Sequence, residues 1–182
     1  MSEPLGQEHG SSDLQLGSLF DAYRASTPGV QACHNATVIL GQEDEVQPDL
    51  FLRILPGIHG QSKNTRKGNH VKGPPELVAE IAYSNRSIDL HVKKERYTCG
   101  GVVEYIVVCL QPAAVHWFDL RSDCKLVADD AGVFRSNVFP GLWIHEVGLL
   151  QLDYRLVMEV LNRGLLSPEH GHFAAQLARA GA

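Results

Sequence analysis

Two acidic residues with apolar neighbours are the first residues of this sequence that could support metal-dependent chemistry. Asp49 follows the proline of PDLFLRIL, and Glu80 lies within LVAEIA. Both segments read as strands, and a buried polar group without a partner costs roughly 2–7 kcal/mol. If the strands are neighbours, the two carboxylates converge at one edge of the sheet. Such pairs resist joint ionisation unless a divalent cation lies between them, so we expect Mg²⁺, with Mn²⁺ as the alternative.

A lysine that could serve this pair lies on the helix predicted over residues 87–101. Asp89, Lys93 and Tyr97 recur at intervals of four residues and therefore share one helical face. If the helix packs on the sheet, this face turns Lys93 towards Glu80. The spacing also suits an exposed Asp89–Lys93 ion pair worth about 0.2–0.5 kcal/mol.

The two strand acids also have a simpler interpretation. Each could be a strand-end acid that faces solvent, or one of the two could pair with Arg53. The spacing of the residues leaves these alternatives open.

Positive charge gathers around the two acids although the whole chain carries a net charge of −5, which argues against a generally basic nucleic-acid-binding surface. Residues 49–97 hold nine Lys or Arg against five Asp or Glu, and no acid lies between Asp49 and Glu76. This distribution suits an anionic substrate, although a solvated basic loop would look the same. The candidate nucleic-acid contacts are Lys63, Arg66, Lys67 and Lys72.

The remaining sequence predicts one α+β domain over residues 1–182, with a mixed sheet flanked by helices. We place its core at about 11–147 and a C-terminal helical extension at about 148–182. The predicted helices cover 11–26, 87–101, 154–164 and 169–180, with Ser11 or Ser12 as the first N-cap. The predicted strands cover 35–41 and 47–55, joined as a hairpin, then 76–82, 102–110, 114–120 and 124–128, with 139–150 a strand or extended segment.

Several classes of protein do not fit the sequence. No apolar run approaches the roughly 18 residues of a membrane span, and the N-terminus does not resemble a signal peptide. The four cysteines form no zinc-like spacing, which favours free thiols and a cytoplasmic location. No feature indicates an organic cofactor.

The ordered motifs resemble those of the Uma-type (DUF820-like) family of putative restriction endonucleases, within the PD-(D/E)xK nuclease superfamily. The matching segments are PDLFL, PELVAEIAYSNRSIDLHVKKERYTCGGVVEYIVV, VHWFDL and VFPGLWI. The resemblance extends from QEHG near the start to SPEHGHF near the end. It implies a restriction-endonuclease-like fold, hydrolysis of DNA phosphodiester bonds and, by analogy with nucleases that cut both strands, a homodimer.

The resemblance also implies roles for individual residues. Asp49 and Glu80 would hold Mg²⁺ together with the backbone carbonyl of Ile81, and Lys93 would orient the attacking water, with Asp89 and Tyr97 as its companions. Glu8 is a candidate for the acid that the first helix often contributes.

The sequence departs from the family pattern at several positions. The lysine expected two residues after Glu80 is replaced by Ala82, and SPS and EYW are replaced by YSN and EYI. The leading hypothesis is therefore a Mg²⁺-dependent endonuclease whose lysine has moved to the following helix. The alternatives are a catalytically inactive nuclease-like domain that binds nucleic acid or a protein partner, and a structural or regulatory domain without nucleic-acid contact.

Overall fold

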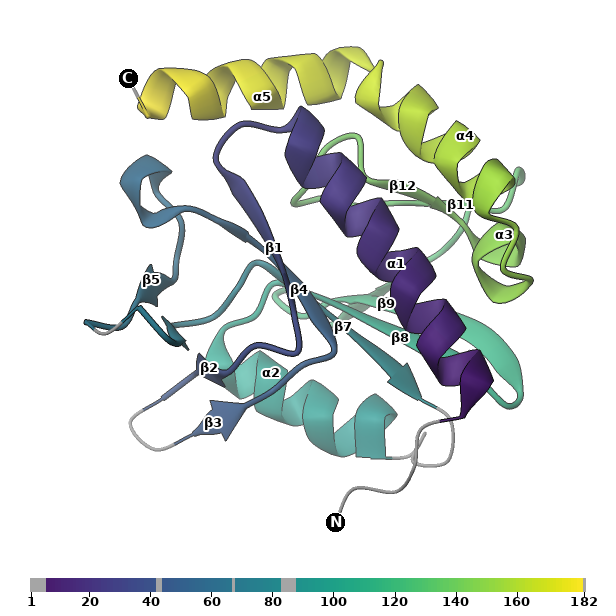
Figure 1. The fold of residues 1–182 in the computed structure, drawn as a ribbon, viewed down its shortest axis with the longest axis horizontal. Coiled ribbons are helices and arrows are strands. Elements are labelled where there is room, and N and C mark those ends of the chain that lie inside the picture. The colour runs from purple at the N-terminus through teal and green to yellow at the C-terminus, as the bar shows by residue number, and fades with distance from the viewer. Residues whose placement is uncertain (1–5, 42–43, 67, 83–87, 182) are drawn as a thin grey trace.

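A six-stranded mixed sheet forms the centre of the computed structural model, which describes residues 6–41, 44–66, 68–82 and 88–181 (Figure 1). Strands β7 and β8 are parallel, and every other neighbouring pair is antiparallel. The predicted α+β class with a mixed sheet is confirmed. The strand order is β1 (Val30–His34), β4 (Leu50–Ile54), β7 (Leu77–Ala82), β8 (Glu104–Leu110), β9 (Ala113–Asp119) and β10 (Cys124–Leu126).

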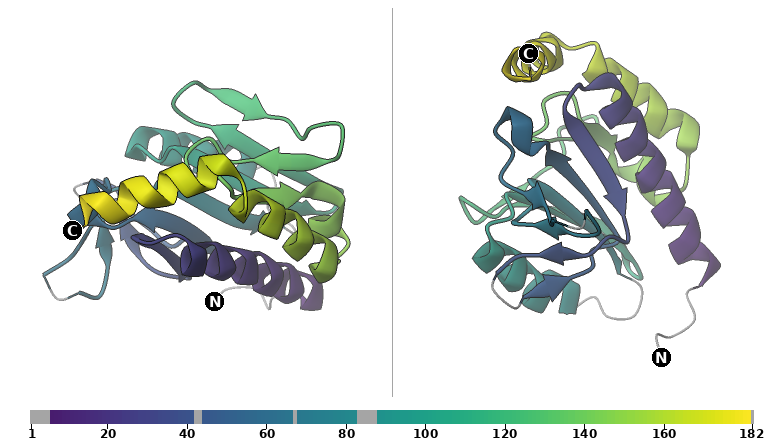
Figure 2. Two further views of the ribbon diagram at one scale, coloured as in Figure 1. Left: turned by 90° about the horizontal axis from the view of Figure 1, so that it is seen from above. Right: turned by 60° about the vertical axis from the view of Figure 1, so that its left-hand side comes forward.

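Helices cover both faces of this sheet, because alternate residues of its buried strands point to opposite sides. Leu50 and Ala79 pack in the cluster that contains helix α1 (Gln7–Ser26), whereas Phe51 and Val78 pack with Tyr97 of helix α2 (Lys94–Gly100). Figure 2 shows α1 and α2 on opposite sides of the central sheet. The sheet therefore separates two apolar clusters.

Helix α1 begins earlier than predicted. The predicted apolar face of Leu16, Leu19, Phe20 and Tyr23 is buried. The helix nevertheless starts at Gln7, and neither Ser11 nor Ser12 caps it, since Gly6 occupies the N-cap without a side-chain hydrogen bond. The additional turn brings residues 7–10 into the helix, at the end of the sheet where β7 finishes (Figure 1).

A second, smaller sheet replaces the predicted hairpin. Its order is β3 (Glu45–Val46), β2 (Val38–Ile39), β6 (Val71–Lys72) and β5 (Lys63–Asn64). The prediction that 35–41 pairs with 47–55 was wrong, because β2 pairs with β3, and β4 pairs with the unpredicted strand β1. The predicted loop 55–74 contains β5, β6 and a short 3₁₀ helix, η1 (Pro56–Ile58). Figure 1 shows these short strands beside the central sheet.

The C-terminal part of the chain packs on α1. Helices α4 (Tyr154–Leu165) and α5 (Pro168–Ala180) follow the hairpin of β11 (Val133–Arg135) and β12 (Trp143–His145), as Figure 1 shows. Residues 146–150 form helix α3 (Glu146–Leu150), so the strand predicted over 139–150 was wrong beyond β12. Nδ1 of His145 accepts the backbone N–H of Gly148 and caps α3. Within the described residues, no helix has the length and apolar character needed to span a membrane.

Candidate active site

Adjacent strands bring Asp49 and Glu80 together at one end of the central sheet. Leu50 of β4 pairs with Ala79 of β7 in an antiparallel ladder, so Asp49 and Glu80 lie one step further along it. The backbone N–H of Ile81 donates to Oδ2 of Asp49 at 2.8 Å. The Glu80 side chain is only 3 % exposed and that of Asp49 is 22 % exposed, so the site has a buried and a solvent-accessible carboxylate.

The chain that follows β7 supplies two donors to the buried carboxylate. The ammonium of Lys93 donates to Oε2 of Glu80 at 2.9 Å, and the hydroxyl of Tyr97 donates to Oε1 at 2.6 Å. Lys93 ends a π-helical segment, η2 (Ile88–Lys93), which continues directly into α2. Segments of π-helix are rare and often occur at functional sites. The side chain of Asp89, the third residue of the predicted face, lies outside the described residues.

Burial sets the electrostatics of Glu80. Desolvation, opposed by the charge of Lys93 and reinforced by that of Asp49, raises the pKa of Glu80 to about 7. Burial and the neighbouring Glu80 carboxylate likewise raise the pKa of Tyr97, which keeps its hydroxyl a donor at neutral pH. The negative charge of Glu80 is therefore only partly compensated by the protein's own groups, although Lys93 lies next to it.

This donor set fits a hard divalent cation. Two neighbouring carboxylates that disfavour joint ionisation are relieved by a cation between them, and Mg²⁺ commonly uses one or two carboxylates and retains waters. Ile81, whose carbonyl was predicted as a further ligand, already joins the two strands through its N–H. Among the residues that the structure describes, no three His, Cys, Asp or Glu side chains form a metal cage. A bound cation would thus depend on Asp49, Glu80, a backbone carbonyl and water.

The first turn of α1 places a histidine beside this pair. Glu8, the acid predicted from this region, is exposed, whereas the next residue, His9, turns inwards. Its Nε2 lies 4.0 Å from Oδ2 of Asp49, and its side chain is 11 % exposed. Sequence reasoning missed His9. It lies seven residues before the buried Leu16, which places both on one face of a helix that starts early enough.

Arg53 is not the partner of Asp49. Its buried guanidinium donates to Oε1 of Gln31 at 2.7 Å and to Oδ1 of Asn64 at 2.5 Å. It thereby ties β4 to β1 and to β5. The interpretation in which Asp49 forms an ion pair with Arg53 therefore finds no support in the contacts of Arg53.

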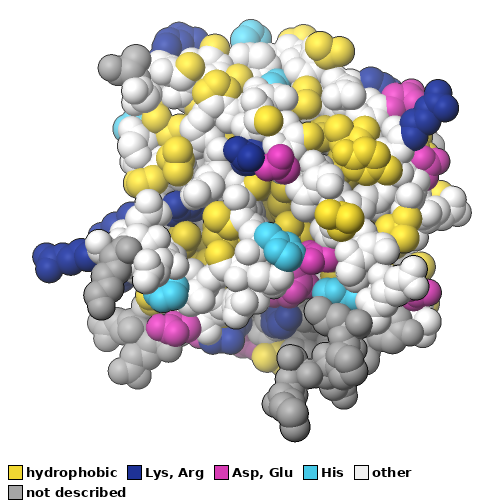
Figure 3. Space-filling view, viewed as in Figure 1, with side chains coloured by type: hydrophobic (Ala, Val, Ile, Leu, Met, Phe, Trp, Pro, Cys, Tyr) yellow, Lys and Arg dark blue, Asp and Glu magenta, His cyan; other side chains and the backbone are white. Residues whose placement is uncertain are grey.

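The predicted nucleic-acid contacts lie on the second sheet rather than among the carboxylates. Lys63, Arg66 and Lys72 are exposed, and Lys67 lies outside the described residues. Lys63 stands directly opposite Lys72 in the antiparallel β5–β6 pair. Lys and Arg side chains project on the left of Figure 3, on the side where Figure 1 shows β5.

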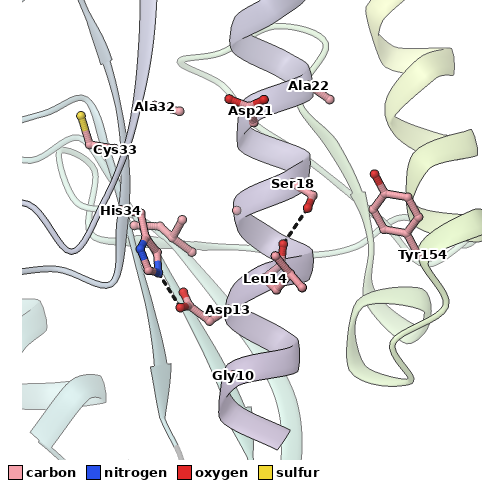
Figure 4. Close-up of a pocket in the computed structure, with 12 residues that line it drawn as sticks. Gly10, Asp13, Leu14, Ser18, Asp21, Ala22, Ala32, Cys33, His34 and Tyr154 are labelled. Carbon is pink, nitrogen blue, oxygen red and sulfur yellow. Dashed lines mark hydrogen bonds and ion pairs between the residues drawn. The ribbon is translucent and has the colours of Figure 1, made fainter. Parts of the chain in front are cut away.

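A groove of about 600 Å³ runs between α1 and β1 (Figure 4). Asp13 and Asp21 lie along it without any lining Lys or Arg, and Oδ2 of Asp13 bonds Nε2 of His34 at 2.5 Å. The backbone N–H of Asn35, the next residue, donates to the carbonyl oxygen of Asp49 at 2.9 Å. The groove is thus a neighbour of the carboxylate site, but its charge is unsuited to phosphate.

Comparison with known proteins yields a family match and similarities to solved structures. The family model Uma2, described as "Putative restriction endonuclease", matches residues 1–152. Among solved structures, the fold is similar to that of a putative nuclease belonging to DUF820 from Anabaena variabilis ATCC 29413. The TM-score is 0.63 with 13 % sequence identity over 83 % of this chain and 85 % of that one, a likeness of fold alone. No curated protein sequence matches the chain.

Proposed function

The chain belongs to the Uma2 family of putative restriction endonucleases, and from this premise we propose that it is a Mg²⁺-dependent endonuclease that hydrolyses DNA phosphodiester bonds. The observation that carries the proposal is the 2.9 Å contact between Nζ of Lys93 and Oε2 of Glu80. It supports a lysine that reaches the carboxylates from the helix after β7, although position 82 holds alanine.

Each residue of the site has a separate role in this proposal. Asp49, Glu80 and the carbonyl of Ile81 would hold Mg²⁺, which when bound lowers the pKa of a water and neutralises charge on the phosphate. Lys93 orients the attacking water and stabilises the negative charge that develops on the phosphate. Tyr97 fixes the Glu80 carboxylate through its 2.6 Å hydrogen bond to Oε1.

The second sheet supports contact with the DNA backbone. Like charges directly opposite each other in an antiparallel pair are destabilising, and Lys63 and Lys72 occupy such positions. Phosphate groups bound between or beside them would offset this repulsion, and Arg66 adds a further exposed cation. Because such contacts release counterions, they give binding that weakens with salt.

Cleavage of supercoiled plasmid DNA with and without Mg²⁺ tests the proposal. Asp49→Asn and Lys93→Met should each lower the cleavage rate by at least about 100-fold, since charge stabilisation at a reacting phosphate is worth several kcal/mol. Lys94→Met is the matched control, because Nζ of Lys94 bonds Asp123 at 2.8 Å instead of a site carboxylate. Wild-type protein that does not cleave with Mg²⁺ or Mn²⁺, or Lys93→Met that cleaves normally, would contradict the proposal.

The alternative function is a catalytically inactive nuclease-like domain that binds nucleic acid or a protein partner. One observation favours it: both carboxylate oxygens of Glu80 already have donors within the protein, Lys93 and Tyr97. Salt-sensitive DNA binding without cleavage, in the presence of Mg²⁺ or Mn²⁺, would support this alternative.

A further inference from the structure

We propose that His9 is a positioning residue of the active site, which holds the Asp49 carboxylate in the orientation that binds metal. The inference rests on the proposed function, because it assigns a residue of α1 to the same site. It replaces the expectation that the first helix contributes Glu8.

The contacts of Asp49 converge on one of its two oxygens. Oδ2 accepts the backbone N–H of Ile81 at 2.8 Å and lies 4.0 Å from Nε2 of His9. The hydrogen bond comes from the neighbouring strand and the longer contact from α1, so groups from two separate elements face Oδ2. We assign Oδ1 to the cation, since ligating carboxylates are usually held by hydrogen bonds from outside the metal site.

A separation of 4.0 Å exceeds a hydrogen bond, so His9 and Asp49 form a loose contact here. A rotation of the Asp49 carboxylate towards Nε2 would shorten this contact to a hydrogen bond. We expect His9 to make that hydrogen bond when Asp49 ligates the cation.

The burial of the imidazole argues against a side chain that merely rests on the surface. Nδ1 of His9 is a buried atom without a hydrogen-bond partner among the described residues, and so is Oδ1 of Asp13, one helical turn further on. A buried polar group without a hydrogen-bond partner destabilises the folded state. If the neutral imidazole carries its proton on Nε2, that N–H faces Asp49.

The experiment measures Mn²⁺ binding to the full chain by isothermal titration calorimetry, with wild-type protein and four variants, His9→Ala, His9→Gln, His34→Ala and Glu8→Ala. His9→Ala should weaken Mn²⁺ binding by about 10- to 100-fold, the usual effect of losing a partner of a metal ligand. His9→Gln, whose amide N–H can take the place of Nε2–H, should recover most of the affinity. His34→Ala is the matched control, because His34 bonds Asp13 and not Asp49; it should bind Mn²⁺ as wild type does.

Thermal unfolding without metal separates positioning from packing. If His9 only packs, His9→Ala lowers the midpoint of metal-free unfolding and leaves the Mn²⁺ affinity unchanged, which overturns the inference. Weaker binding in Glu8→Ala but not in His9→Ala overturns it as well. Equal Mn²⁺ affinity of wild type and His9→Ala in a protein that cleaves DNA refutes this inference alone. Wild-type protein that binds no Mn²⁺ refutes both it and the proposed function.

Discussion

Two buried glutamates on neighbouring strands, Glu80 of β7 and Glu104 of β8, have opposite kinds of surroundings. Glu104 is fully buried, and its carboxylate accepts hydrogen bonds from four uncharged donors. These are Nε1 of Trp117 at 3.1 Å, Oγ of Ser136 at 2.7 Å, and the backbone N–H groups of Asn137 at 2.7 Å and Val138 at 3.2 Å. Glu80 has one ammonium, one phenol and a second carboxylate as neighbours.

The two glutamates also face different sides of the sheet. Glu104 is followed by Ile106 on the α1 side, whereas Glu80 lies between Val78 and Ala82, which pack on the α2 side. Burial raises the pKa of both carboxyl groups. The donors of Glu104 belong to rigid backbone and packed side chains and join β8 to residues 136–138. The neutral donors around Glu104 suit a structural role, whereas the ammonium and the second carboxylate beside Glu80 suit the proposed metal site.

The largest expected difference is in stability. Glu104→Gln should lower the free energy of unfolding by about 3–5 kcal/mol, because an amide can accept from only one side and its NH₂ group would face at least one buried donor. Glu80→Gln, the same chemical change, should lower the free energy of unfolding by no more than about 1 kcal/mol at pH 8, since Tyr97 can still donate to the amide oxygen. Urea unfolding of both variants measures this. Equal losses would remove the distinction between the two sites.

The pH dependence of Glu80 sharpens the comparison. Its pKa in the folded protein is about 7, against 4.5 for the free side chain, so the folded state binds more protons between these values and loses stability as pH rises. The free energy of unfolding of Glu80→Gln relative to that of wild type should therefore rise from pH 4.5 to 7, by on the order of 3 kcal/mol, so that the variant's deficit is smallest above pH 7. Unfolding measured from pH 5 to 9 tests this, and a constant difference would contradict it.

Much of this arrangement could be predicted from the sequence, and the misses have physical causes. LVAEIA and EYIVVCL are apolar enough to be read as central strands. In strand β1, VQACH, Val30 is the one buried residue, and the pairing of β1 with β4 depends on contacts distant in sequence. Helix α3 follows β12 directly, without an intervening loop, and the cap from His145 marks its start.

The sequence allowed only part of the candidate site to be predicted. Asp49 and Glu80 stand out because their neighbours are apolar. The π-helical segment that precedes α2 and ends at Lys93 could not be predicted, because helical faces are predicted from a regular period of 3.6 residues. His9 could not be placed, because α1 begins without a capping side chain to mark its start. Local composition therefore indicated the carboxylates, whereas the geometry around them comes from tertiary packing.

Removing the phenol donor tests what holds Glu80 in place. Tyr97→Phe deletes the 2.6 Å hydrogen bond to Oε1 and little else, and a hydrogen bond to a charged group contributes about 1.5–3 kcal/mol. We expect a loss of about 1.5 kcal/mol at pH 8 and a smaller loss at pH 5, where Glu80 is protonated. Equal losses at the two pH values, measured by urea unfolding, would show that Tyr97 stabilises the core alone.

The smallest expected effect on stability concerns Lys63 and Lys72, two like charges that lie opposite each other in the second sheet. Lys72→Gln should raise the free energy of unfolding by up to about 0.5 kcal/mol by relieving repulsion with Lys63. It should also lower the slope of log DNA affinity against log salt by about 0.9. Lys125→Gln, an exposed lysine opposite Phe118, is the control. An unchanged slope in Lys72→Gln would exclude it from phosphate contact.

The alanine at position 82 bears on which positions of the chain can carry the lysine of this site. Ala82 is 2 % exposed and lies on the same side of β7 as Glu80, in the cluster that contains Tyr97. A lysine introduced there would compete with Lys93 for the same carboxylate and would displace packed side chains. The strand and helix positions would thus be alternative hosts for one ammonium group, and Ala82→Lys would need a compensating change at Lys93.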